Sequence, residues 1–184
     1  FCTVDLSAFY FDIRKDNLYC DPKNSKKRQS TILLLNIILN SLLKWFAPVL
    51  SFTTEEIYRL ISSNNKSIHL EKFIVFPEKF KNDKLNQKWL ELIKIRNICN
   101  ISIEEKRASK EIGSSLEASL KINLDKNLIN ISKDVDFSEL CITSNAELFY
   151  KEKSETTIQT SKAKGNKCPV CWKITVEGCS RHSQ

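Results

Sequence analysis

The sequence predicts a mainly α-helical protein, in which a helical bundle is followed by a small α+β unit and a compact cysteine-rich module. Three observations predict this class. Residues 25–46 and 83–110 carry apolar side chains at helical spacing. After Gly113 the apolar residues alternate with polar ones, which is typical of a strand. Beyond residue 163, cysteines recur at short spacing.

The composition is that of a globular protein of ordinary size. Of the 184 residues, 41% are hydrophobic, and a chain of this length can bury about 70% of its unfolded surface. With only 3 glycines and no GxGxxG or GxxxxGK[ST] sequence, a glycine-rich phosphate-binding loop is not expected. The chain contains no methionine, which predicts a fragment or a processed piece of a longer protein.

No segment predicts export or insertion into a membrane. Residues 1–10 lack the basic start and the small residues of a signal peptide. The most apolar stretch, residues 32–46, is interrupted by Asn36, Asn40 and Lys44 and is too short to span a bilayer. We therefore expect a soluble, cytoplasmic protein.

The first half of the chain predicts helices separated by prolines. Residues 1–18 form the end of a helix, which Pro22 breaks. Residues 25–46 form a long helix whose apolar side chains wrap most of its circumference, as is typical of a central helix in a bundle. Pro48 ends that helix.

A short helix and an irregular segment come next. Thr53 and Glu56 have the spacing of a capping box, which predicts a helix that continues to about Ile61. We expect residues 62–65 to form a loop and residues 68–76 to be extended and irregular.

The second half predicts one long helix and then a mixture of strands and helix. Residues 83–110 form the helix, which Gly113 ends. The alternation of apolar and polar residues predicts a strand over 116–124, and residues 126–132 a short helix. Further short strands are predicted at 140–143 and 147–151, and residues 156–165 form either a last strand or a linker.

The C-terminal cysteines have the spacing of a zinc site. Cys168 and Cys171 form a Cys-x2-Cys knuckle, and seven residues later Cys179 and His182 form a Cys-x2-His knuckle. Three thiolates and one imidazole complete a tetrahedral set, which indicates one structural Zn²⁺ with no position open to a substrate. The seven-residue spacer can form a small hairpin, and Gly178 can turn the chain into the second knuckle.

Two other interpretations of this cluster stay open. One is a redox Cys-x2-Cys pair, although such pairs usually open a helix within a βαβ unit, and the sequence shows none. The other is a chance grouping. The remaining cysteines are expected to be free core thiols in a reducing compartment; they are Cys2, Cys20, Cys99 and Cys141.

The net charge of +7 permits an anionic partner. Residues 151–184 hold seven Lys or Arg against three Glu, and a second basic cluster lies in residues 23–28. Each cluster is either a solvated face or a set of phosphate contacts, and phosphate contacts would make binding depend on salt.

No catalytic arrangement is visible. His69 is the only histidine besides His182, and it stands alone in a predicted loop with no catalytic partner visible. Two pairs of adjacent glutamates occur, at residues 55–56 and 104–105. Adjacent side chains on a helix point to different faces, so neither pair forms an acid/base couple. Glu56 is better explained as a helix cap.

Four segments resemble one known family. Residues 47–58 (APVLSFTTEEIY) resemble the APxLxFTxEExW/Y segment in the helical anticodon-binding domain of class I aminoacyl-tRNA synthetases. Residues 9–16 (FYFDIRKD), 107–118 (RASKEIGSSLEA) and 167–172 (KCPVCW) are similar to the FYxDIxKDRLY, RxxKxIGSSLEA and KCxRCW segments of bacterial isoleucyl-tRNA synthetases. The chain departs from the family at Asn17 and Val170, where Arg is usual, and at His182, where Cys is usual.

The resemblance implies a division into three parts and a partner. Residues 1–112 would be the helical anticodon-binding domain, truncated at its N-terminus, 113–162 a small α+β junction domain, and 163–184 the zinc-knuckle module. The partner would be the anticodon stem-loop of isoleucine tRNA. The family joins L-isoleucine to that tRNA with ATP and Mg²⁺ in a catalytic domain which, like the editing domain, this chain does not contain. The resemblance therefore implies an inactive, monomeric fragment that works with those domains.

The resemblance also assigns roles to individual residues. Trp172 is either a platform on which an unpaired base stacks or a cap on the zinc core. Basic residues would contact tRNA phosphates; they are Lys162, Lys164, Lys167, Lys173 and Arg181 in the C-terminal part, and Lys26, Lys27 and Arg28 at the start of the long helix. Cations at a helix N-terminus oppose the helix dipole, which hints at an anionic partner there.

Two alternatives belong to other classes. One is a stand-alone RNA-binding zinc protein without ligase activity. The other is a structural helical and zinc module that binds nucleic acid no better than its net charge predicts. Arg96, on the apolar side of its helix, is as compatible with a buried ion pair or a cap as with RNA contact.

Overall fold

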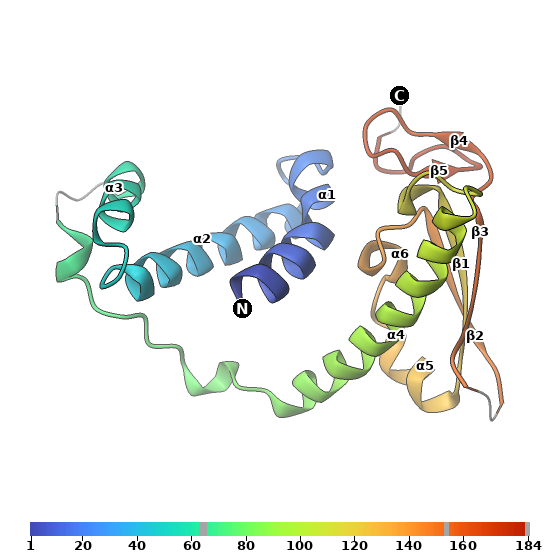
Figure 1. Ribbon diagram of the computed structural model, residues 1–184, viewed down its shortest axis with the longest axis horizontal. Coiled ribbons are helices and arrows are strands. Elements are labelled where there is room, and N and C mark those ends of the chain that lie inside the picture. Colours follow the sequence, from blue (N-terminus) through green and yellow to red (C-terminus); the bar gives the residue numbers. More distant parts are fainter. Residues whose placement is uncertain (63–65, 153–154, 183–184) are drawn as a thin grey trace. The chain divides into compact units, whose positions relative to one another are not determined.

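The computed structural model (Figure 1) describes residues 1–62, 66–152 and 155–182. The chain forms two compact units. The first combines Phe1–Asp16 with Asn82–Gln184, and the second is Asn17–Lys81. The division into three domains that the resemblance implies remains a prediction.

A three-stranded sheet organises the first unit. Strand β1 (Ala118–Leu124) lies in the centre, with β2 (Asn145–Tyr150) parallel on one side and β3 (Thr157–Lys162) antiparallel on the other. Ile122 lies opposite Leu148 and Ile158 in this register. The predicted alternation is confirmed, because every second residue of β1 from Ala118 onward is fully buried.

Helices cover one face of this sheet (Figure 1). They are α4 (Asp83–Ala108), α5 (Lys126–Ser132) and the one-turn helix α6 (Phe137–Leu140). Leu92, Ile95, Cys99 and Ile103 recur at helical spacing along α4 and are buried in the same core as β1. The predicted helices over 83–110 and 126–132 are therefore confirmed, the first ending two residues early.

The N-terminal residues are helical, as predicted, but in two forms. Residues Cys2–Phe11 form a π-helix, in which the Leu6 N–H donates to the Phe1 carbonyl at 3.1 Å, and the α-helix α1 (Asp12–Cys20) continues from it. Ile13 of α1 enters the core of the first unit.

The second unit contains α2 (Lys26–Phe46), α3 (Ser51–Ile61) and the 3-10 turn η2 (Ile68–Leu70). Its small core consists of Leu43, Ala47, Tyr58 and Ile68. The irregular course expected for residues 68–76 is confirmed outside η2, and a further 3-10 turn, η3 (Glu78–Phe80), follows. The loop predicted over 62–65 falls largely outside the described residues, since only Ser62 is described.

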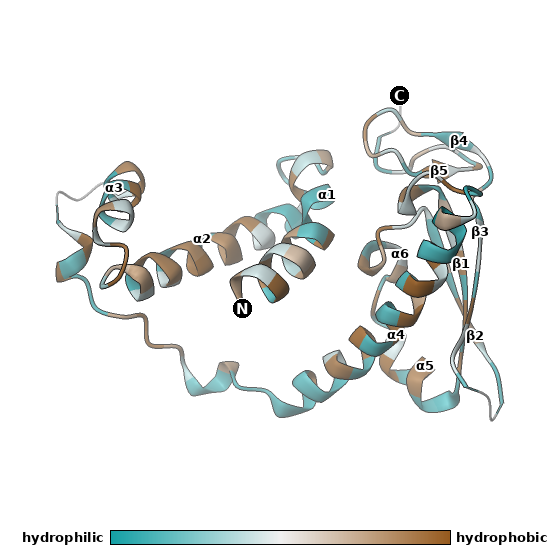
Figure 2. Cartoon of the chain, in the orientation of Figure 1, coloured by the Kyte–Doolittle hydropathy of each residue, from teal (hydrophilic) through white to brown (hydrophobic). Residues whose placement is uncertain are grey.

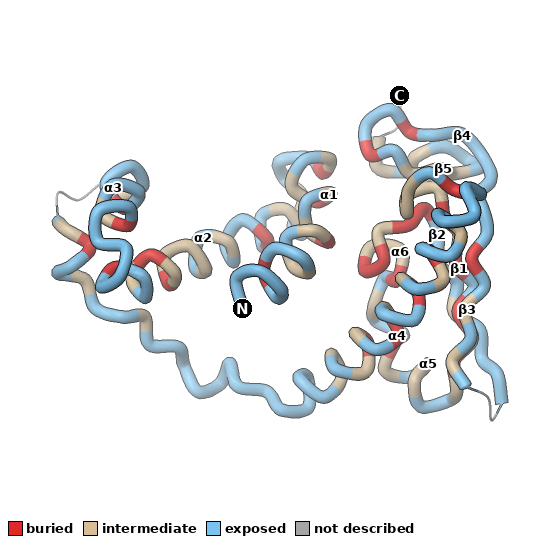
Figure 3. The backbone as a smooth tube through the Cα atoms, viewed as in Figure 1, coloured by how far each residue is buried: buried red, intermediate tan, exposed pale blue. Residues whose placement is uncertain are grey.

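The long helix α2 is apolar along most of its length (Figure 2), but it is not the buried centre of a bundle in this chain (Figure 3). Leu33 is 64% exposed and Trp45 is 47% exposed, whereas the buried positions of α2 are Thr31, Ser41 and Leu43. The expectation of a central helix is therefore wrong for the chain as described. None of the described helices combines the length and the apolarity needed to cross a membrane.

Two helices begin or end for reasons other than those predicted. Thr53 lies inside α3, which begins at Ser51 after Leu50 without a side-chain cap, so Thr53 and Glu56 do not form a capping box. At the other boundary, Lys110 rather than Gly113 adopts the left-handed conformation that ends α4, with φ +58°. The N–H of Glu111 then donates to the Lys106 carbonyl at 3.1 Å.

Two expectations for the sheet are also corrected. Residues 140–143 are not a strand, because α6 and a turn with Ile142 at φ +56° occupy this region. Of the two alternatives for residues 156–165, the structure shows a strand, which spans Thr157–Lys162.

Because β1 and β2 are parallel and joined through α5 and α6, the chain does contain a βαβ-type connection. The Cys-x2-Cys pair lies outside it.

Candidate metal centre and nucleic-acid interface

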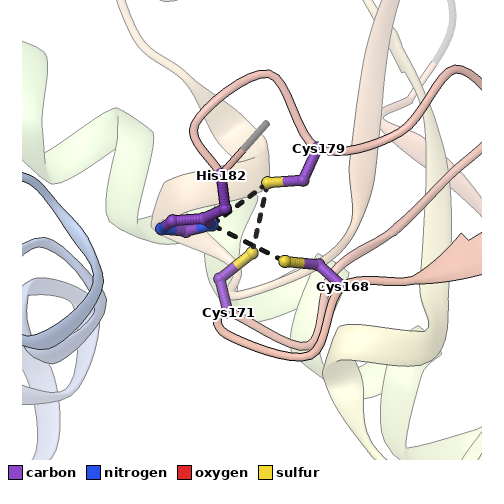
Figure 4. A group of neighbouring side chains, drawn as sticks. All are labelled: Cys168, Cys171, Cys179 and His182. Carbon is purple, nitrogen blue, oxygen red and sulfur yellow. Dashed lines mark hydrogen bonds between the residues drawn. The ribbon is translucent and has the colours of Figure 1, made fainter. Parts of the chain in front are cut away.

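The four residues predicted as zinc ligands converge in space (Figure 4). The ligand atoms of Cys168, Cys171, Cys179 and His182 all lie within 4.8 Å of one another. The imidazole Nδ1 lies 3.6 Å from Cys168 Sγ and 3.2 Å from Cys179 Sγ, and the sulfurs of Cys171 and Cys179 are 3.7 Å apart.

These distances fit a tetrahedral zinc site. Zinc–sulfur bonds of about 2.3 Å at tetrahedral angles place two sulfurs about 3.8 Å apart, and a zinc–nitrogen bond of about 2.05 Å places nitrogen about 3.6 Å from sulfur. The sulfur–sulfur distance of 3.7 Å and the nitrogen–sulfur distance of 3.6 Å agree with these values, whereas the second nitrogen–sulfur distance, 3.2 Å, is shorter. The donor set is also one that zinc prefers over Mg²⁺ or Ca²⁺, which take oxygen ligands.

The local fold explains why these side chains converge. Strands β4 (Asn166–Lys167) and β5 (Ile174–Thr175) pair as a small hairpin around the first knuckle. Across that turn the Cys168 N–H donates to the Lys173 carbonyl at 2.9 Å, and the Trp172 N–H to the Cys168 carbonyl at 3.0 Å. The expectation that the seven-residue spacer forms a hairpin is therefore wrong, because the spacer supplies only β5, and its partner β4 lies before the first knuckle.

Two glycines shape the rest of the module. Gly178 has φ +86°, a left-handed conformation that confirms the predicted turn into the second knuckle. Gly165, with φ +121°, approaches β5 so closely that an added Cβ would lie 2.2 Å from the Thr175 carbonyl oxygen. The role of Gly165 was not predicted, because it depends on a strand nine or more residues away.

The electrostatic environment favours thiolates in part of the cluster. The backbone N–H of Cys171 is the main cause that lowers the pKa of the Cys168 thiol to about 6. Burial raises the pKa of the Cys171 thiol to about 12. Burial also opposes ionisation of Cys179, but the Arg181 N–H and neighbouring side chains outweigh it and lower the Cys179 pKa. Thiolates are the form that binds a metal ion.

The C-terminal module (residues 163–182) is attached to the α+β part of its unit by polar side chains. The hydroxyl of Ser144 accepts from the Ile174 N–H at 2.6 Å and donates to the Leu116 carbonyl. The Lys173 ammonium donates to the Ser138 hydroxyl at 3.3 Å. The module is therefore part of the first unit and is held by contacts that do not involve the cysteines.

Trp172 is presented outward. Its backbone has φ +64°, and its side chain is 58% exposed. The ammonium of Lys167 lies 5.5 Å from the centre of the indole ring, which is a cation–π distance. The exposure favours the interpretation of Trp172 as a stacking platform over that of a cap on the metal core.

The basic residues proposed to contact phosphate differ in how available they are. Lys162, Lys164 and Lys167 are exposed, whereas Lys173 and Arg181 are partly buried. Arg181 forms an ion pair with Asp16 of α1, so it already serves a structural role. Sequence reasoning missed Asp16 because the pair joins residues that are far apart along the chain.

The basic start of α2 lies in the second unit. Lys26 and Lys27 are exposed, and Arg28 donates to the Asp21 carbonyl at 2.8 Å. Ser25 caps the helix by accepting from the Arg28 N–H. Arg28 therefore fixes the turn between α1 and α2, while the two lysines face solvent.

Two further residues have roles that sequence reasoning left open or missed. Arg96 donates to the Leu140 carbonyl at 2.9 Å and lies 5.2 Å from the centre of the Phe9 ring, so it caps α6. Glu55 accepts from the Ser67 hydroxyl at 2.8 Å and the Ile68 N–H at 2.9 Å, which ties η2 to α3. The neighbouring Glu56, predicted as a cap, has no such contact.

The other cysteines divide by burial. Cys99 and Cys141 are buried free thiols of the first core, as expected. Cys2 is exposed and Cys20 is half-buried, so the expectation of a core position is wrong for Cys2.

Residues 1–122 match the family described as the anticodon-binding domain of tRNA ligase, and the chain belongs to this family. The chain is also similar to isoleucine–tRNA ligases along most or all of its length. An isoleucine–tRNA ligase of Pelagibacter ubique (strain HTCC1062) is 68% identical over 183 residues, which cover 100% of this chain and 20% of the relative. Isoleucine–tRNA ligases of Bradyrhizobium diazoefficiens and Rhodopseudomonas palustris are 41% and 39% identical over 187 and 189 residues, each covering 95% of this chain and 19% of the relative.

The resemblance to isoleucyl-tRNA synthetases is therefore confirmed. The chain spans about a fifth of the length of the curated relatives it matches. The family match ends at residue 122, within β1, whereas the relatives also cover the C-terminal module.

Proposed function

We propose that this chain is the tRNA-binding and zinc-binding C-terminal portion of an isoleucine–tRNA ligase, and that it holds the anticodon stem-loop of isoleucine tRNA. The observation that carries the proposal is the 68% identity to an isoleucine–tRNA ligase over the whole chain, the Cys/His cluster included. In this role the chain would orient the tRNA while its acceptor end reaches a distant active site.

Zinc would be held by Cys168, Cys171, Cys179 and the Nδ1 atom of His182. When bound, the ion supplies a structural cross-link and no reaction chemistry, because all four tetrahedral positions are taken by the protein. The metal-bound knuckle would fix the neighbouring Trp172 and Lys167, which lie at a cation–π distance, with the Trp172 ring exposed. An exposed, rigid ring costs little entropy when an unpaired base stacks on it.

The phosphates of the stem-loop would contact exposed lysines. Lys162, Lys164 and Lys167 lie along β3, the following turn and β4, a continuous stretch of the first unit. Lys26 and Lys27 offer a second set of contacts at the start of α2. Contacts of this kind supply affinity without sequence preference and weaken as salt rises.

The attachment of isoleucine with ATP and Mg²⁺ would be carried out by other parts of the ligase. We propose that the 184-residue chain alone is inactive, monomeric and cytoplasmic. The relatives are about five times as long as the aligned segment, which does not favour a stand-alone RNA-binding protein.

The test is equilibrium binding of the zinc-loaded chain to isoleucine tRNA and to the same tRNA with a different anticodon, each at low and at moderate salt. We expect a preference of at least 10-fold for the isoleucine anticodon that persists at the higher salt. Equal affinities that fall steeply with salt would mean that the basic surface is only a phosphate footprint, and the proposed anticodon readout would be refuted.

A further inference from the structure

The second knuckle of the metal site is held differently from the first. The first knuckle lies within the β4–β5 hairpin, whereas residues 176–182 contain neither helix nor strand. A turn forms the second knuckle, and it is closed by the His182 N–H, which donates to the Cys179 carbonyl at 3.2 Å. The two ligand residues stand at the two ends of this turn. The conformation of the second knuckle therefore depends on the metal ion more than that of the first does.

Arg181 lies inside this turn, and its side chain extends away from the metal site. Its backbone N–H donates to the Cys179 sulfur, whereas its guanidinium donates to the carboxylate of Asp16 in α1, 165 positions away in the sequence. The side chains of Arg181 and Asp16 are 29% and 26% exposed. Solvent and salt therefore screen this ion pair less than they screen a fully exposed one.

The N-terminal segment (residues 1–16) is anchored to the rest of the first unit by apolar packing and by ion pairs. Phe9 and Ile13 contribute to the apolar core, and Arg14 forms an ion pair with Glu139 near the end of α6. Asp16 is the last residue of this segment that belongs to the first unit. The pair between Arg181 and Asp16 thus fastens α1 at the point where the chain leaves the unit.

We propose that Arg181 is a positioning residue through which metal binding at the second knuckle stabilises the docking of α1 in the first unit. With the metal ion bound, both ends of the turn are fixed and the guanidinium is already held near Asp16. In the metal-free turn the same ion pair must also restrict the backbone of Arg181, and this loss of entropy offsets its electrostatic gain. The proposal rests on the zinc site of the proposed function and does not depend on tRNA binding.

Thermodynamic linkage makes this coupling reciprocal. If the metal ion strengthens the ion pair, the ion pair must strengthen metal binding by the same factor. Asp16 is not a ligand and lies on a different element, so an effect of Asp16 on the zinc affinity identifies the coupling. An ion pair of equal strength in the metal-free and metal-loaded protein would stabilise the fold but leave the zinc affinity unchanged.

The test is a double-mutant cycle on the zinc affinity of the full chain, measured by competition with a chromophoric chelator. The unmodified chain is compared with Asp16→Asn, with Arg181→Gln and with the double variant. Asp12→Asn is the matched control, because Asp12 is a carboxylate of the same helix that pairs with Lys15 within that helix. Amide hydrogen exchange of residues 1–16, with and without zinc, is a second measurement, and residues 118–124 of β1 are the internal reference.

We expect Asp16→Asn to raise the zinc dissociation constant about 3- to 10-fold, and the double variant to bind no more weakly than Arg181→Gln alone. Asp12→Asn should bind zinc within about twofold of the unmodified chain. Removal of zinc should speed exchange in residues 7–16 about fivefold or more in the unmodified chain, and less than about twofold in Asp16→Asn, with β1 unchanged in both.

Two results would overturn the proposal and leave the zinc site standing. One is a zinc affinity of Asp16→Asn equal to that of Asp12→Asn. The other is a double variant in which the two single effects simply add, because additive effects mean that Arg181 and Asp16 act on the metal site independently. Failure of the unmodified chain to bind zinc would overturn both this proposal and the zinc site of the proposed function.

Discussion

Replacing His182 tests the metal centre most directly. The imidazole Nδ1 is the atom that lies 3.2 to 3.6 Å from two of the three sulfurs. His182→Ala leaves three thiol ligands and one open position. Structural zinc sites bind with about 10–16 kcal/mol at neutral pH, so one ligand of four is worth roughly 2.5–4 kcal/mol if the ligands share this energy equally. At about 1.4 kcal/mol per factor of ten, the zinc dissociation constant should rise by roughly 60- to 700-fold.

The assay is competition for zinc between the protein and a chromophoric chelator at neutral pH. His182→Cys should retain binding within about tenfold, because a fourth thiolate completes another common structural zinc set. His69→Ala is the matched control, since it removes the only other histidine of the chain, an exposed residue of the second unit. An affinity of His182→Ala within twofold of the unmodified protein would refute His182 as a ligand, and the tetrahedral argument with it.

Substitutions at three further positions test the fold of the two units. Ile122→Ala should lower the free energy of unfolding by about 2–5 kcal/mol in urea titrations, because Ile122 is fully buried in the central strand. Asp136→Ala should cost about 0.5–2 kcal/mol, and Asp136→Asn much less, since the Asp136 carboxylate caps α6 by accepting from the Ser138 N–H at 2.8 Å. Glu55→Gln should flatten the acid side of the stability profile. The Ser67 hydroxyl is the largest cause that lowers the Glu55 pKa below 4.5, so its contribution is present above that pH and is lost as the pH falls through the lowered value; the check is the thermal midpoint between pH 3 and pH 6.

Local pattern predicted the parts of the fold that depend on neighbouring residues. The alternation in β1 and the helical spacing in α4 were readable because burial on one side repeats along the sequence. The metal ligands could be predicted for a similar reason, because each knuckle supplies two ligands from one tight turn. All four predicted ligand residues converge, although no local rule fixes the distance between the knuckles.

The features that were missed depend on partners distant in the sequence or on backbone strain. Arg96 caps α6 through the Leu140 carbonyl, and the two residues are 44 positions apart. Lys110 and Ile142 adopt left-handed conformations that their residue types disfavour, so local pattern predicts a helix end at Gly113 and a strand over 140–143 instead of these turns. Local backbone hydrogen bonds hold both turns, from the Glu111 N–H to the Lys106 carbonyl and from the Thr143 N–H to the Ser138 carbonyl.

Ser144 shows how the metal centre and the sheet depend on each other. Its hydroxyl lies between the Leu116 carbonyl, just before β1, and the Ile174 N–H in the metal-site hairpin. Ser144 is itself held by the Ala118 carbonyl, to which its N–H donates at 3.1 Å. These bonds keep the hairpin backbone on the sheet without a contribution from the cysteines. Loss of the metal ion should therefore loosen the knuckles, with Trp172, before it detaches β5 from the rest of the unit.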